Sequence, residues 1–139
     1  MTQPIQATVN VKNLPISTKY TVEICDFIRN NPIDLAKKKL ERILAKKIAL
    51  PLKRFNKDRG HRKGNIAAGS YPVNSTKTVL KMLNSVESNA SDKGMNKASL
   101  YIKSIIANHG PKVWRHGRLR RRTAKRTHLK IIVEERVKK

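Results

Sequence analysis

The chain has 139 residues, the size of one domain, and its 32 Lys and Arg against 9 Asp and Glu give a formal net charge of +23. So large an excess of one sign opposes compaction unless a polyanion neutralises it. No apolar stretch reaches the ~18–20 residues that span a bilayer, and the first eight residues do not resemble a secretion signal. Nucleic acid is therefore the expected polyanion, with an anionic membrane surface as the main alternative.

The first part of the chain predicts a strand and two helices. Residues 5–11 alternate apolar and polar side chains, which is the period of a half-buried strand. A helix that Ser17 or Thr18 can cap is expected to end near Asn31, and a second, heavily basic helix restarts at Pro32. The expected apolar faces are Val22, Cys25 and Ile28 in the first helix, and Ile33, Ala36, Leu40, Ile43 and Leu44 in the second.

A loop and a third helix follow. Residues 53–70 show no sustained period, contain three glycines and carry many cations, which predicts a long basic loop. The third helix is expected over about residues 75–91. It should end at Lys93 and Gly94, because glycine readily takes the left-handed conformation that follows a helix. Its apolar stripe is Val79, Leu80, Leu83, Val86 and Ala90.

The last part of the chain predicts a hairpin. Residues 100–107 read as one strand, and apolar residues alternate again over 129–133 in another. The two strands are joined by a long basic connection, so a loop at about 108–128 should project away from the core. If the strand at 5–11 pairs with them, the fold is α+β, with a three-stranded antiparallel sheet packed with three helices. We expect residues 1–139 to form this single domain.

The connection between the two last strands is the densest cluster of cations, and no acidic residue occurs from Lys93 to Val133. Arg pairs bidentately with phosphate and stacks on bases, and Trp114 and His116 add stacking surfaces for unpaired RNA bases. A solvated charge run is the alternative, as is a local hydrophobic anchor for Trp114. Because apolar strands hold both ends, we favour RNA contact. The candidate RNA-binding residues here are Lys112, Trp114, Arg115, His116, Arg118, Arg120, Arg121, Arg122, Lys125 and Arg126.

A second basic cluster lies in the loop after the second helix. Its glycines do not form the Gly-x-x-x-x-Gly-Lys-Ser/Thr pattern, so nucleotide hydrolysis is not expected. Contact between a flexible backbone and RNA phosphates is the favoured use, and a loop without function is the alternative. The candidate RNA-binding residues here are Lys53, Arg54, Arg59, His61, Arg62 and Lys63.

No catalytic set, metal site or cofactor is expected. The four histidines are scattered and do not have the spacing of a zinc site. Cys25, the single cysteine, lies on an apolar helix face, which predicts a buried thiol and suits a reducing compartment. Four acids lie on basic helices, where ion pairing is the ordinary role: Asp26, Asp34, Glu41 and Glu87.

Several short motifs occur in a specific order and spacing. They are Tyr71-Pro72, the helix end from Glu87 to Gly94, the strand start Leu100-Tyr-Ile102, Gly110-Pro111-Lys112, His116-Gly117-Arg118 and the closing strand from Thr127 to Glu135. Together, over residues 17–136, they resemble the universal large-subunit ribosomal protein family numbered twenty-two in bacteria and seventeen in eukaryotes. The segment from Leu50 to Phe55, followed by Gly60-His61, is similar to the archaeal and eukaryotic branch.

The resemblance implies an α+β domain on the outer surface of the large subunit, with a hairpin extending along the peptide exit tunnel. Its partners would be ribosomal RNA, neighbouring ribosomal proteins and, at the tip, the nascent peptide, with no membrane. The location would be the cytoplasmic ribosome, and the nucleolus during assembly in a eukaryote. Only residues 112–115 separate Gly110-Pro111 from His116-Gly117-Arg118, fewer than the family pattern has, so a shorter hairpin is expected.

Three other classes of protein share parts of this pattern. A nucleic-acid compactor would have the charge, and it would bind duplex DNA as well as structured RNA. An RNA-modifying enzyme would show turnover, and a membrane-active protein would cause leakage of vesicles. The cations lie in a hairpin connection rather than in a tail or along one helix face, which favours the ribosomal reading over all three.

Overall fold

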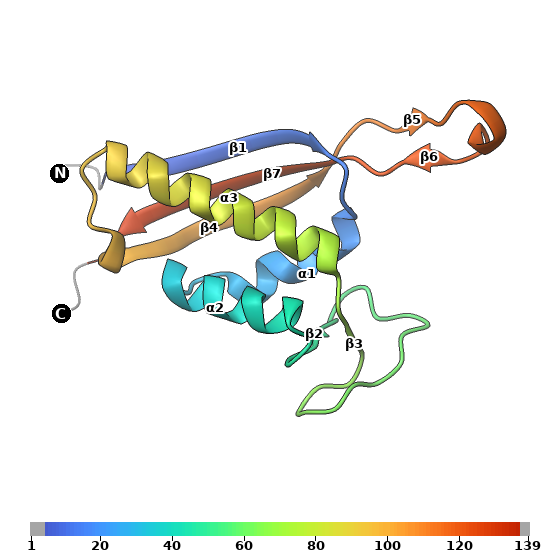
Figure 1. Cartoon of the computed structure of the whole chain (residues 1–139), viewed down its shortest axis with the longest axis horizontal. Helices are drawn as coiled ribbons and strands as arrows, with labels where there is room; N and C mark the ends of the chain where they lie inside the picture. Colours follow the sequence, from blue (N-terminus) through green and yellow to red (C-terminus); the bar gives the residue numbers. More distant parts are fainter. Residues whose placement is uncertain (1–4, 137–139) are drawn as a thin grey trace.

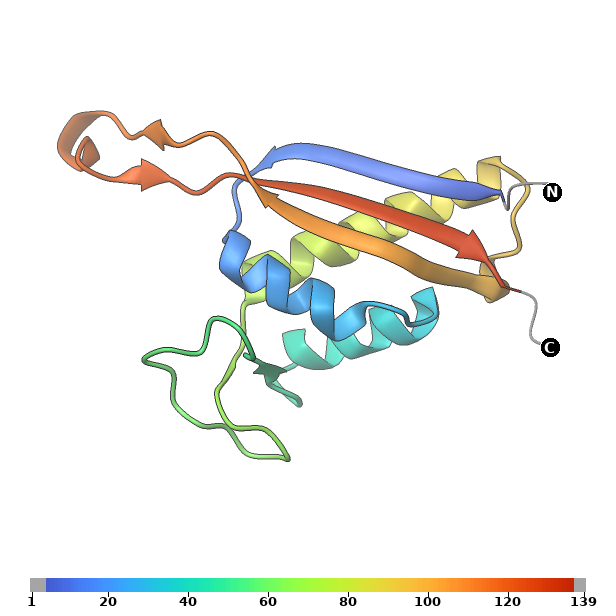
Figure 2. The ribbon, with the colours of Figure 1, turned by 180° about the vertical axis from the view of Figure 1, so that it is seen from behind.

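A three-stranded antiparallel sheet forms the back of the molecule, and three helices cover one of its faces (Figures 1 and 2). The computed structural model describes residues 5–136. The strands are β1 (Gln6–Leu14), β4 (Leu100–His109) and β7 (Thr127–Glu135), in the order β1-β7-β4. Figure 2, seen from behind, shows the strands in front of the helices, so the other sheet face is open. The predicted α+β fold with this sheet is confirmed.

The register of the sheet follows the predicted alternation. Ile131 in the central strand lies opposite Val9 on one side and Ile105 on the other. Leu129, Ile131 and Val133 are all fully buried, since residues two apart in a strand face the same side. β1 continues beyond the predicted residue 11, through an irregularity at which Asn13 adopts a positive φ of 59°.

Helix α1 (Thr18–Ile28) buries a different stripe from the one predicted. Ile24, Cys25 and Ile28 are buried as part of the core, whereas Val22 is only half-buried, so the prediction for Val22 was wrong. The buried positions, which include Thr21, follow the spacing of three and four residues that keeps side chains on one helix face. A strict spacing of three drifts around the helix, which is why Val22 turns away.

Helix α2 (Ile33–Leu44) buries Ile33, Ala36, Leu40 and Ile43 as predicted, and Leu44 is half-buried. Helix α3 (Val73–Asp92) begins directly after Pro72, two residues before the predicted start. It ends as expected, with Lys93 as its cap and Gly94 at φ +72°. α3 packs on β1 and β7 with one side and on α2 with another, while α1 packs on β4 (Figure 1).

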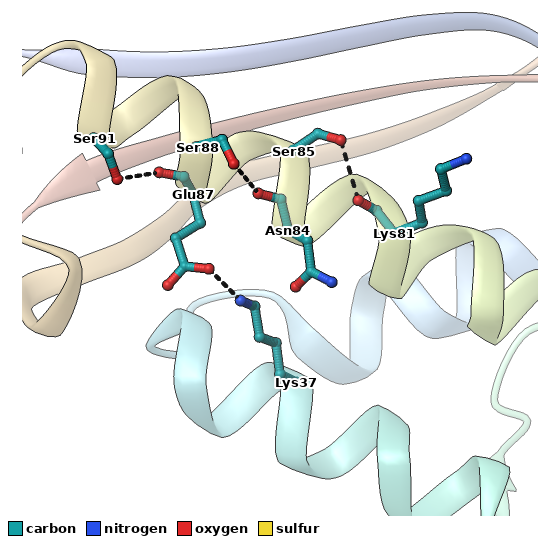
Figure 3. Close-up of polar contacts among 7 residues, drawn as sticks. All are labelled: Lys37, Lys81, Asn84, Ser85, Glu87, Ser88 and Ser91. Atoms are coloured by element: carbon teal, nitrogen blue, oxygen red, sulfur yellow. Dashed lines mark hydrogen bonds and ion pairs between the residues drawn. The ribbon is translucent and has the colours of Figure 1, made fainter.

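Polar groups on α3 find partners within the fold (Figure 3). Lys37 of α2 forms an ion pair with Glu87 of α3, which joins the two helices. The hydroxyls of Ser85, Ser88 and Ser91 each donate to the carbonyl oxygen four residues earlier. These three serines therefore satisfy their hydroxyl groups within the helix.

Candidate nucleic-acid interface

A basic arm, residues 110–126, extends the strand pair β4 and β7 beyond the sheet (Figure 1). Its own short strands, β5 (Val113–Trp114) and β6 (Thr123–Ala124), are paired, and the N–H of Arg115 donates to the carbonyl of Arg122 at 2.9 Å. A 3₁₀ turn at Gly117–Leu119 closes the tip. The predicted projecting hairpin is confirmed, and much of its connection is paired rather than open loop.

At the base of the arm, the outgoing and returning segments of the chain lie very close together. The N–H of Gly110 donates to the carbonyl oxygen of Arg126 at 2.9 Å. A Cβ at position 110 would lie 2.7 Å from the Cβ of Arg126 and 3.0 Å from its carbonyl carbon. Only glycine at position 110 therefore allows the two segments to approach this closely.

A buried pair of hydroxyls ties the arm to the body of the protein. Thr127, which follows the arm directly, is fully buried and donates its hydroxyl to the carbonyl oxygen of Ile16 at 2.9 Å. The hydroxyls of Thr127 and Thr18 lie 2.8 Å apart and share a hydrogen bond. The direction of the arm is thereby fixed relative to the start of α1.

The candidate residues of the arm lie at its surface. All are exposed except Arg126, which is half-buried beside Gly110. Trp114 is 67% exposed, so its ring is open to a stacking partner and does not serve as a local hydrophobic anchor. Arg118, Arg120 and Arg121 gather around Gly117 at the tip.

The basic loop, residues 52–68, is closed by a short pairing of β2 (Leu50–Pro51) with β3 (Gly69–Ser70). Within it the N–H of Arg62 donates to the carbonyl of Ala67, and His61 forms a bridge with Ala68. The loop is therefore folded back on itself. Its six candidates are exposed: Lys53, Arg54, Arg59, His61, Arg62 and Lys63.

Glu23 holds the start of the basic loop, and sequence reasoning missed it. Glu23 is only 2% exposed, and its carboxylate accepts hydrogen bonds from three backbone N–H groups. These belong to Lys53 at 3.1 Å, Arg54 at 2.8 Å and Phe55 at 2.7 Å. Hydrogen bonds to a charged acceptor are the stronger ones, so this contact sets the path of the loop. An acid directly before the apolar pair Ile24 and Cys25 was the one available signal.

Arginines of the basic loop lie against aromatic rings of the body. The guanidinium of Arg59 is 5.4 Å from the centre of the Tyr20 ring, and that of Arg62 is 5.8 Å from the Tyr71 ring. Such contacts stabilise a cation while leaving part of it accessible. The loop is therefore positioned by the body at several points.

A groove of about 430 Å³ lies where the arm, the basic loop and α1 meet. It brings together four predicted residues, Arg59, Lys112, Lys125 and Arg126, whereas the remaining candidates lie outside it. It also contains residues that sequence reasoning missed. We call it the base groove, and it is lined by Ser17, Thr18, Lys19, Tyr20, Phe55, Arg59, His109, Gly110, Pro111, Lys112, Thr123, Ala124, Lys125 and Arg126.

Ion pairs in the described part of the chain lie in the body and not in the arm or the basic loop. Asp26 pairs with Arg29, and Glu87 with Lys37, as predicted for these two acids. No such pair is formed by Asp34 or Glu41 within residues 5–136, so the ion-pairing prediction was wrong for them. The cations of the arm and loop are left to attract a polyanion.

Glu134 lies in the central strand β7, one residue before the strand ends. It pairs with Lys103 at 3.0 Å and with Arg136 at 3.4 Å. The hydrogen bond from Lys103 is the main cause that lowers the pKa of this carboxyl from its ordinary value of 4.5. The pair joins the two strands β4 and β7 near the end opposite the arm.

Cys25 is a structural residue. It is 2% exposed, and burial raises the pKa of its thiol to about 12. The reactive thiolate is therefore not formed near neutral pH. Across residues 5–136 no group of three or more His, Cys, Asp or Glu side chains is placed to hold a metal ion. Within the same range no helix has the length and apolar character to cross a membrane.

Comparison with known proteins agrees with the geometry. Residues 9–134 match the family described as Ribosomal protein L22p/L17e. The chain is 43% identical over 136 residues to a large ribosomal subunit protein uL22 of Nanoarchaeum equitans, a match that covers 93% of this chain and 78% of that protein. To the uL22 protein of Methanocaldococcus jannaschii it is 37% identical over 131 residues, covering 89% and 84%. The chain therefore belongs to the ribosomal protein L22p/L17e family, whose members are non-enzymatic structural constituents of the large ribosomal subunit in translation.

Proposed function

We propose that the chain binds large-subunit ribosomal RNA through the arm and the basic loop, supports its assembly, and lines part of the peptide exit tunnel with the tip of the arm. The observation that carries this proposal is the separation of charge. The arm and the loop project from the end of the molecule opposite the start of β1 and the end of β7 (Figure 1). Their candidate cations, of which only Arg126 is half-buried, are free of ion pairs among the described residues.

The mechanism is scaffolding, with no bond made or broken. Arg and Lys side chains neutralise phosphates, which supplies most of the affinity for a nucleic acid. Trp114, with its exposed ring, stacks on an unpaired base. Because the arm and loop leave the body in different directions, they contact separate RNA segments and hold them at a fixed distance (Figures 1 and 2).

Further partners follow from the same arrangement. The chain works as one domain on the cytoplasmic ribosome, passing through the nucleolus during assembly if its source is a eukaryote. Neighbouring ribosomal proteins of the large subunit contact the body, and the nascent peptide passes the tip of the arm at Gly117–Leu119. The short connection between Gly110 and His116 limits how far the tip reaches into the tunnel.

The test is sedimentation of the tagged protein from cell lysate, before and after a high-salt wash. The unchanged chain should remain with the large subunit through the wash. A variant with Arg120→Ala, Arg121→Ala and Arg122→Ala should be largely lost from the particle, because these residues are the densest cationic cluster of the arm. Loss of the unchanged chain, or full retention of the triple variant, would contradict the proposal.

A control variant of equal net charge distinguishes a specific role of the arm from an effect of total charge. Lys38, Arg42 and Lys46 are exposed cations on or just after α2, away from the arm. The variant with all three changed to Ala has the same net charge as the arm variant. It should remain with the large subunit, whereas equal loss of both variants would mean that total charge alone decides retention.

A further inference from the structure

The base groove combines two kinds of side chain that phosphate neutralisation alone does not require. Its cations are Lys19, Arg59, Lys112, Lys125 and Arg126, and none of them pairs with a carboxylate in the described part of the chain. Beside them lie the rings of Tyr20, Phe55 and His109. The whole chain has only six Phe, Tyr and Trp residues, so two of them in one basic groove call for a specific ligand.

The rings in the groove are held in place. The hydroxyl of Tyr20 accepts a hydrogen bond from Ser70 at 3.3 Å, and Arg59 lies over its ring. Phe55 is half-buried, with the ammonium of Lys19 at 5.8 Å and the guanidinium of Arg54 at 5.5 Å from its ring centre. A ring fixed in advance loses little entropy when a flat ligand stacks on it.

The size and shape of the groove select the form of nucleic acid. About 430 Å³ lies within the ~300–1,000 Å³ of pockets that enclose a small ligand, which suits one nucleotide. A paired RNA helix is wider than such a groove, and its stacked bases offer no free faces to a ring. An unpaired nucleotide has both a free base face and a phosphate.

We propose that the base groove binds a single unpaired nucleotide of ribosomal RNA, with its base against Phe55 and Tyr20 and its phosphate held by Lys125 and Arg126. This inference rests on the proposed function and names the form of RNA that the site takes. The bound nucleotide contacts α1, the basic loop and the arm at once, because all three line the groove. It therefore fixes the arm relative to the loop when RNA is present.

The experiment measures binding of the purified full chain to two RNA hairpins that differ by one nucleotide. One has a single bulged 2-aminopurine, and in the other an added uridine in the opposite strand pairs with it. The bulged RNA should bind roughly 5- to 150-fold more tightly, the range that corresponds to stacking of one base on an aromatic ring. Its fluorescence should fall on binding, because stacking quenches 2-aminopurine.

Two variants locate the effect. Phe55→Leu keeps apolar volume and removes the ring, so it should abolish the preference for the bulge while leaving affinity for the paired RNA unchanged. Phe27→Leu makes the same change at a half-buried ring that lies outside the groove and is not a proposed RNA contact, and it should preserve the preference. Circular dichroism spectra that match the unchanged chain establish that both variants are folded.

The possible failures are distinguishable. Equal affinity for both hairpins, or a preference that survives Phe55→Leu, overturns the groove proposal and leaves the proposed function standing. Absence of binding to either hairpin at low salt overturns the proposed function as well. Adenosine monophosphate is the third probe: if it displaces the bulged RNA at equal concentration, the groove is a site for free nucleotides and the RNA assignment is wrong.

Discussion

The body of the protein and its projecting end are built on different principles. The body is formed by β1, β4, β7 and the three helices, and its apolar side chains are buried. All the ion pairs within residues 5–136 also lie in the body. In the arm, every residue from Pro111 to Thr123 is exposed and no carboxylate is present. The difference teaches that the buried core and the cations proposed to bind RNA are located in separate parts of one small chain.

The largest expected effect is the decrease in RNA affinity of the arm and the basic loop as the salt concentration rises. If the arm and loop make ~6–10 phosphate contacts, affinity for a ribosomal RNA fragment should fall about 10³- to 10⁵-fold between ~50 and ~200 mM salt. The free energy of unfolding should change far less, since the body depends on apolar burial. Filter binding and urea unfolding at matched salt measure the two quantities. A flat response of the affinity would contradict this division.

The next effect in size concerns the centre of the body. Ile131→Ala should lower the free energy of unfolding by about 2–5 kcal/mol, because a fully buried side chain is replaced by a cavity. Trp114→Ala, at an exposed site on the arm, should change it by less than ~0.5 kcal/mol. Urea unfolding of both variants makes the comparison. A large loss from Trp114→Ala would show that the arm packs on the body in solution.

Substitution of Glu23 tests how the basic loop is attached to the body. Glu23→Gln removes the charge that accepts three backbone N–H groups, and it should cost about 1.5–3 kcal/mol of unfolding free energy. Amide hydrogen exchange at residues 53–55 should accelerate, because Gln replaces one accepting oxygen with an amide nitrogen that cannot accept and leaves the other oxygen without its charge. Glu41→Gln on the exposed side of α2 is the control and should change neither quantity. Unaltered exchange at residues 53–55 would mean that the loop is held by other contacts.

The smallest effect is the pH dependence caused by Glu134. Its pKa in the folded state is lowered from 4.5, mainly by the hydrogen bond from Lys103. The carboxylate therefore stabilises the fold above the unfolded value, and this contribution is lost as the pH falls through the lower folded pKa. Stability of the unchanged chain should fall more steeply in acid than that of Glu134→Gln. Identical acid profiles for the two proteins would exclude this role.

The sequence predicted most of the body, because burial of a strand or helix face leaves a period in the order of residues. The alternation at residues 129–133 and the stripe of α2 were both found in the structure at the predicted places. The departures were local. Val22 was assigned to a buried face because spacing by three imitates a helical stripe, and α3 began earlier because Pro72 can directly precede a helix.

The interface was predictable in part. The arm and the loop were predicted because their clusters of cations lie between segments with a clear strand or helix period. The base groove was not, because Tyr20, Phe55 and Lys125 come from three segments far apart in the chain and meet only in the fold. Glu23 was missed for the same reason, since its partners lie 30 to 32 residues away.

The close crossing at Gly110 and Arg126 has a consequence for how such a chain can change over time. Beyond this crossing no arm residue takes part in the buried core, so insertions and deletions there alter the outer segment alone. Each doubling of a flexible segment costs only about 0.6 kcal/mol in chain entropy. The length of the arm beyond Gly110 and Arg126 can therefore change during evolution without a change in the buried core. How far the protein extends from its body can evolve independently of its ability to fold.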